Sequence, residues 1–61
     1  MTESTRRRLE RAARSLRGEW NYCIVLSSAW HLSERQRRQL MESAKCYRMR
    51  AERYQDWLDR A

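Results

Sequence analysis

HLSERQ, residues 31–36, decides the fold of this chain, because it separates two halves that each repeat apolar side chains at helical spacing. Ser33 followed by Gln36 is the pattern of a capping box. In this motif the serine oxygen accepts a hydrogen bond from the Gln36 N–H, and the glutamine side chain reaches back to the Ser33 N–H. Glu34 falls in the first turn of the helix that follows, where the helix dipole favours an acid. The pattern predicts that a second helix begins near Glu34 and runs to about residue 60.

Apolar side chains recur alternately four and three residues apart on both sides of this break. The first half supplies Leu9, Ala13, Leu16, Trp20, Cys23, Ser27 and Trp30, and the second half supplies Leu40, Ala44, Tyr47, Ala51, Tyr54, Leu58 and Ala61. This rhythm places each set on one face of a helix, and only Ser27 is clearly polar. The chain has no proline and one glycine, which also favours an all-α fold. We therefore predict helices over about 5–31 and 34–60, with a turn over 31–33 and Ser4 or Thr5 as the first cap.

A turn this short forces the two helices to run antiparallel, as a helical hairpin. Residues whose numbers sum to about 64 are then expected to face each other, which pairs Trp20 with Ala44 and Ala13 with Ala51. The whole chain, 1–61, is expected to form a single domain. A chain of 61 residues buries so little surface that its monomer would be only marginally stable. We expect it to form a homodimer in which two hairpins make a four-helix bundle.

The first predicted helix is apolar nearly all round between Glu19 and His31. Because one neighbouring helix covers only one face, part of this apolar surface must stay uncovered, and such a surface is typical of interaction sites. The predicted dimer or partner interface consists of Tyr22, Val25, Leu26, Ala29 and Trp30. The composition of Tyr22–Leu26 would also suit a β-strand, although a lone strand would need pairing partners that this chain does not supply.

Arginine dominates the charge of the chain. The formal net charge is +6, from fourteen Lys and Arg against eight acids, and every basic residue except Lys45 is arginine. Arginine binds carboxylate and phosphate groups through paired hydrogen bonds, which predicts an acidic partner, protein or nucleic acid. A solvated basic surface explains the composition equally well. The candidate contact residues are Arg7, Arg11 and Arg14 in the first helix and Arg35, Arg37 and Arg38 at the start of the second.

Two further features bear on binding. Cations in a first helical turn oppose the helix dipole, which makes the second arginine group a candidate for function or a tolerated mild defect. Trp57 lies near Arg53 in the sequence, and tryptophan with arginine is typical of interface hot spots. The alternative is that Trp57 widens the apolar stripe of the second helix.

The chemistry of the chain argues against catalysis. It has a single histidine, no glycine-rich loop and no pair of carboxylates at a suggestive spacing, so we expect a protein that is not an enzyme. Cys23, His31 and Cys46 lack the close ligand pairs of a structural zinc site, and we expect no cofactor. The longest apolar run, Tyr22–Leu26, is far below the roughly 20 residues of a membrane span. The polar N-terminus is unlike a secretory signal, and a cytoplasmic protein without a membrane partner is expected.

In its small size, high arginine content and lack of catalytic chemistry, the chain resembles small phage-encoded helical proteins that inactivate host regulators or defence complexes. The resemblance is one of class and carries no residue role to this chain. It implies a cytoplasmic inhibitor that binds a larger protein stoichiometrically. The alternative prediction is a dimeric regulator that presents its arginines to DNA or RNA.

Overall fold

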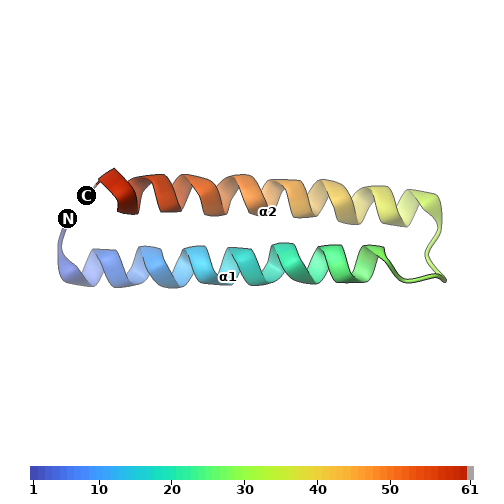
Figure 1. Ribbon diagram of the computed structural model, residues 1–61, viewed down its shortest axis with the longest axis horizontal. Coiled ribbons are helices and arrows are strands. Elements are labelled where there is room, and N and C mark those ends of the chain that lie inside the picture. The colour runs from blue at the N-terminus through green and yellow to red at the C-terminus, as the bar shows by residue number, and fades with distance from the viewer. Residues whose placement is uncertain (61) are drawn as a thin grey trace.

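The computed structural model describes residues 1–60, which form two antiparallel helices, α1 (Glu3–Ser27) and α2 (Glu34–Arg60). Figure 1 shows them side by side along their length, with both termini at one end. The all-α helical hairpin is therefore confirmed, while the four-helix bundle stays a prediction. The β-strand alternative for Tyr22–Leu26 is wrong, because this segment belongs to α1. Ala61, the last member of the second predicted stripe, lies outside the described residues.

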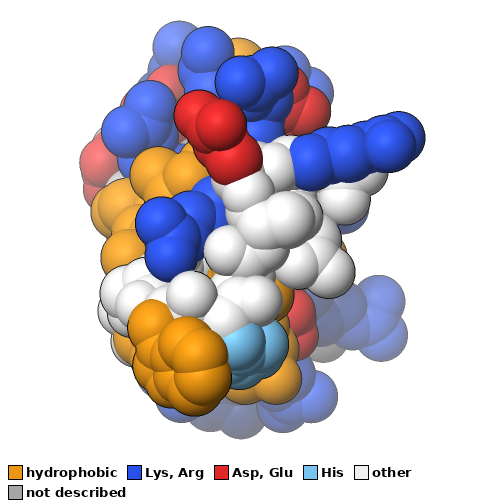
Figure 2. Space-filling model, turned by 90° about the vertical axis from the view of Figure 1, so that its right-hand side faces the viewer, with side chains coloured by type: hydrophobic (Ala, Val, Ile, Leu, Met, Phe, Trp, Pro, Cys, Tyr) orange, Lys and Arg blue, Asp and Glu red, His pale blue; other side chains and the backbone are white. Residues whose placement is uncertain are grey.

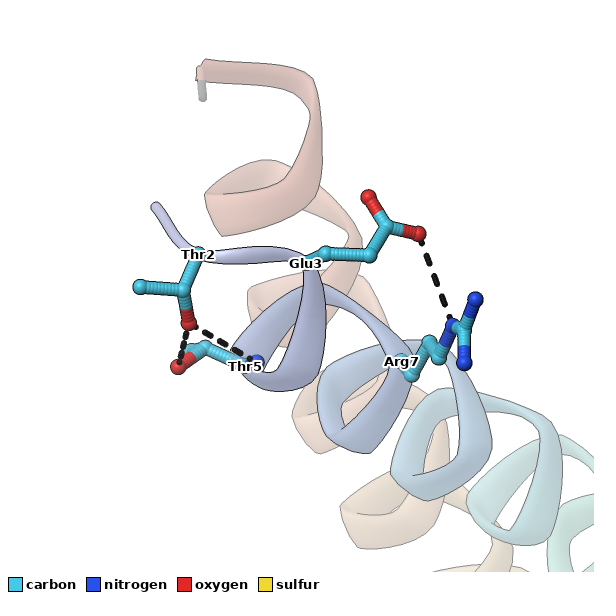
Figure 3. Close-up of polar contacts among 4 residues, drawn as sticks. All are labelled: Thr2, Glu3, Thr5 and Arg7. Atoms are coloured by element: carbon cyan, nitrogen blue, oxygen red, sulfur yellow. Dashed lines mark hydrogen bonds and ion pairs between the residues drawn. The ribbon is translucent and has the colours of Figure 1, made fainter.

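Helix α1 begins earlier than predicted because Thr2, rather than Ser4 or Thr5, caps it. Thr2 has an extended backbone, and its hydroxyl oxygen accepts a hydrogen bond from the Thr5 N–H at 3.2 Å. One otherwise unpaired donor of the first turn is thereby satisfied. Figure 3 shows this cap beside the ion pair of Glu3 and Arg7, whose Oε1 and Nε atoms are 3.5 Å apart.

Helix α1 also ends sooner than predicted, at Ser27 instead of near residue 31. The hydroxyls of Ser27 and Ser28 donate hydrogen bonds to the carbonyls of Ile24 and Val25, both at 2.7 Å. The Ser28 N–H donates to the Val25 carbonyl at 3.3 Å and the Ala29 N–H to the Leu26 carbonyl at 3.1 Å, so the last turn tightens into bonds between residues three apart and the α-helix stops. The connection consequently occupies residues 28–33 and is longer than the predicted turn.

Helix α2 begins at Glu34, as predicted. The Ser33 N–H donates to Gln36 Oε1 at 2.9 Å, and the Gln36 N–H donates to Ser33 Oγ at 3.2 Å, which confirms both halves of the capping box. The guanidinium of Arg37 donates to the carbonyl of Ala29 at 3.3 Å. This contact ties the first turn of α2 to the connection.

The core of the hairpin is thin and consists mostly of small side chains. The buried residues are Ala13, Cys23, Ala44, Ala51 and Leu58, all from the predicted stripes. The larger stripe residues, such as Leu16, Trp20 and Tyr47, are only half-buried. Two helices can cover only one face of each other, so the large stripe side chains other than Leu58 remain partly in contact with water.

One side-chain contact between the helices departs from the predicted pairing. If the numbers of facing residues sum to about 64, Arg17 should lie opposite residue 47. Its guanidinium instead donates to Gln55 Oε1 at 2.5 Å. Side chains lean toward the N-terminus of their own helix. The Arg17 side chain therefore extends toward the open end of the hairpin, and the Gln55 side chain extends toward the turn. The two side chains meet at a level between their Cα atoms. Trp20 and Ala44, which were predicted to face each other, do line one groove.

Candidate partner-binding surface

Large exposed apolar side chains gather in the part of the hairpin next to the turn. They are Tyr22, Ile24, Val25 and Leu26 of α1, Trp30 of the connection and Met41 of α2. Figure 2 looks onto the turn end and shows hydrophobic side chains at its lower edge and along one side, close to Lys and Arg side chains. Exposed apolar side chains gathered in this way are characteristic of interaction sites.

The geometry of α1 explains why this surface extends around the helix. Cys23 is buried against α2. Its neighbours Tyr22 and Ile24 point roughly 100° to either side of it, and Val25 points almost directly away. Tyr22 is consequently 60 % exposed and Val25 59 % exposed. A helix that is apolar on all sides thus has only one side covered by its own chain.

One part of the apolar surface is a patch on the outer side of α1. Tyr22, Val25 and Leu26 form this outer patch, and all are exposed. The other members of the predicted interface lie in the connection. Ala29 is half-buried, and its carbonyl accepts hydrogen bonds from Leu32 and Arg37. The structure therefore brings only part of the predicted interface together on one helix.

Trp30 does not pack in the seam between the helices, where its place in the first apolar stripe had put it. It lies in the connection and is 88 % exposed, because α1 has already ended at Ser27. Its ring meets the ring of His31 edge-on, with the centroids 5.9 Å apart. Trp30 is therefore the most exposed of the large apolar side chains at the turn end.

A second part of the apolar surface lines a groove of about 440 Å³ between the two helices. Its apolar lining comes from Trp20, Ile24, Met41 and Ala44, and its charged lining from Arg38, Glu42, Lys45 and Arg48. We call this site the basic groove. Its cationic side comes entirely from α2, whereas its apolar lining is shared by both helices.

The six candidate arginines form two separate groups. Arg7, Arg11 and Arg14 lie toward the open end of the hairpin, whereas Arg35, Arg37 and Arg38 lie at the turn end, since the helices are antiparallel. All six are exposed. Two of them have structural partners: Arg7 pairs with Glu3, and Arg37 binds the Ala29 carbonyl. Only Arg38 lines the basic groove.

Trp57 lies near the open end, away from the apolar surface at the turn. It is 46 % exposed, and its ring packs edge-on against Tyr54, with centroids 5.4 Å apart. Tyr54 belongs to the apolar stripe of α2 and is half-buried. Trp57 thus extends this stripe outward and remains partly exposed.

Sequence reasoning missed several residues of the basic groove. Ile24, Met41, Lys45 and Arg48 were not predicted as site residues. A usable signal was present, because Arg38, Met41, Lys45 and Arg48 follow a spacing of three, four and three that runs beside the main stripe. The contribution of α1 to the same groove depends on how the two helices are packed.

Comparison with protein-family models, with curated proteins and with solved structures gave no match. Neither helix, over the residues described, is long and apolar enough to cross a membrane. Within residues 1–60, no three His, Cys, Asp or Glu side chains are placed to hold a metal ion. Cys23 is buried and Cys46 exposed, and both are free thiols.

Proposed function

We propose that this chain is a small non-enzymatic interaction module that binds a larger partner protein stoichiometrically and inhibits it. The observation that carries the proposal is the apolar surface next to the turn, where Tyr22 and Val25 are each more than half exposed. Burying apolar surface contributes about 25 cal/mol per Å². A partner that covers this apolar surface would therefore gain binding free energy, because the hairpin itself leaves the surface exposed to water.

Self-association is part of the proposal. Among residues 1–60 the buried side chains are four small ones and one leucine, which is a small core for an independent domain. A second hairpin packed on the outer patch would cover Tyr22, Val25 and Leu26 and complete a four-helix bundle. Two-fold dimers place the same patch of both copies in contact, which suits a patch that is uniformly apolar.

The outer patch is tested by the variants Val25→Asp and Leu26→Asp, with Met49→Asp as the matched control. Met49 is 54 % exposed on α2 and is no part of the patch. Sedimentation equilibrium measures the dimer, and quantitative affinity capture from cells that naturally produce the protein measures the partner. We expect both patch variants to lose the dimer, the captured partner or both, while the control keeps them. Unchanged mass and unchanged capture in both patch variants would exclude the outer patch as an interface.

A second candidate function is a dimeric regulator that binds nucleic acid. It is supported by the net charge of +6 and by the exposure of Arg11 and Arg14 on α1. Its test is binding to a random DNA duplex at increasing salt. Phosphate contacts predict a steep loss of affinity as salt rises, and fewer released ions in the variant Arg7→Gln/Arg11→Gln/Arg14→Gln. Binding that is weak at low salt and unaffected by this variant would exclude the second candidate.

A further inference from the structure

We propose that the basic groove holds an acidic amphipathic helix of the partner protein, so that binding converts the two-helix hairpin into a three-helix bundle. The inference rests on the proposed function and names the chemistry of the partner segment. It concerns a different surface from the outer patch, because Ile24 and Tyr22 point to opposite sides of Cys23.

The shape of the groove favours a helix as its occupant. Two helices side by side leave a valley between their ridges, into which the side chains of a third helix can pack. The basic groove lies in this valley and shares Trp20 and Arg48 with an adjoining hollow that also includes Arg17 and Ala51. The combined surface therefore runs along the hairpin, as an elongated helical ligand requires.

The lining of the groove requires apolar side chains from the ligand. Ile24 is 39 % and Met41 50 % exposed, and Trp20 is half-buried beside them. Their exposed surface faces a site that no other segment of residues 1–60 fills. Leucine-like side chains on one face of a helix would cover it, in the same way that the core stripes cover each other.

The charges of the groove require acids beside those apolar side chains. Arg48 directly follows Tyr47 of the α2 seam, at the flanking position where coiled coils carry charges that select their partners. Arg38 and Lys45 line the same groove from positions further round the helix. Among the described residues that line the groove, Glu42 is the single acid, so the site is basic as a whole. Among residues 1–60, Arg38 and Lys45 form no ion pair, and Arg48 has only an exposed contact of 3.9 Å with Glu52. Glutamates on the flanks of the incoming helix would complete these pairs.

Two other occupants fit less well. A second copy of the chain carries the same charge of +6, and a two-fold contact would set one basic groove against another. Nucleic acid would satisfy the cations through its phosphates but would leave Trp20, Ile24 and Met41 uncovered. An acidic amphipathic helix satisfies the apolar and the charged lining together.

The test uses synthetic peptides of about 20 residues, long enough for roughly five helical turns. The probe has leucines at seam spacing and glutamates on both flanks. One control peptide has lysine in place of glutamate, and another has the composition of the probe in an order without a stripe. Calorimetry measures affinity, and amide chemical shifts locate the contact. We expect the probe to bind at least about tenfold more tightly than either control, with shifts concentrated around residues 20–24 and 38–48.

Matched variants of the chain separate the groove from the overall charge. Arg38→Gln/Lys45→Gln/Arg48→Gln removes the cations of the groove. Arg8→Gln/Arg50→Gln/Arg60→Gln removes equal charge from exposed residues that do not line it and are not among the candidate contact arginines. We expect the first variant to lose about tenfold or more in probe affinity and the second to change little. Circular dichroism checks that both keep the helical content of the unchanged chain.

Four results of the binding experiments would overturn the inference. The first is an equal loss of probe affinity in both triple variants, and the second is a probe that binds no more tightly than the control peptides. The third is a set of amide shifts centred on the outer patch. The fourth is a DNA duplex that shifts the amides of the groove when the probe does not. Dimerisation that disappears in the groove variant alone would assign the site to a second copy and overturn it as well. Capture of the partner that depends on Val25 but not on the groove would defeat this inference while leaving the proposed function standing.

Discussion

Replacing Gly18 with alanine tests whether the outer side of α1 is free, as the hairpin requires. Gly18 lies inside α1 and has no positive φ, and a Cβ added to it would meet no atom within 4 Å. The substitution therefore costs no contact. It should stabilise the chain by about 0.5–1 kcal/mol, the difference between glycine and alanine inside a helix. For a domain of this size, 1 kcal/mol corresponds to roughly 4–8 °C in Tm.

The assay is thermal unfolding followed by circular dichroism, at a low and at a high protein concentration. Gln39→Ala, at an exposed position of α2, serves as a control and should change Tm less, because no glycine is removed. A Tm of Gly18→Ala that is unchanged or lower at both concentrations would refute the reasoning.

The dependence on concentration gives the measurement a second use. Gly18 precedes Tyr22 by four residues and Val25 by seven, so it shares their side of the helix. If a second copy packs tightly against this backbone, the added methyl group would meet it. Stabilisation that is present at low concentration and lost at high concentration would then locate the dimer contact at Gly18. Stabilisation at both concentrations means that no neighbour packs closely at this point.

Other predictions concern the caps and the core, with stability measured by urea unfolding. Ser33→Ala should lower the free energy of unfolding by about 1 kcal/mol because it removes the acceptor of the Gln36 N–H. The double variant Ser33→Ala/Gln36→Ala should lose less stability than the sum of the two single variants, and full additivity would contradict the reciprocal pairing. Thr2→Ala should also cost about 1 kcal/mol, and no loss would mean that Thr2 does not cap α1 in solution. Leu58→Ala should lower the free energy of unfolding by about 2–5 kcal/mol because Leu58 is buried. Leu26→Ala should cost clearly less, because Leu26 is 36 % exposed. Equal losses of stability would show that a neighbouring molecule covers Leu26.

Features governed by contacts between near neighbours in the sequence were predictable. Ser33 and Gln36 are three residues apart, and their reciprocal hydrogen bonds depend on the backbone of a single helical turn. The stripe residues Ala13 and Ala51 are buried because the helical repeat alone puts them on one face. The end of α1 was harder to predict, because the apolar rhythm continues to Trp30 while the serine hydroxyls at 27 and 28 already bind the carbonyls of the last turn.

The sequence by itself determined that the chain forms two helices, where the second one begins, which faces they bury and that apolar surface remains near the turn. These properties follow from the periodicity of one helix and from the hydrogen bonds of one turn. Only the tertiary structure decided that the Arg17 guanidinium reaches Gln55, that Arg37 binds the connection, and that Ile24 and Met41 line the same basic groove. Each of these arrangements brings separate segments together. It depends on the length of the connection and on the lean of side chains along antiparallel helices, which the pattern of either helix alone does not contain.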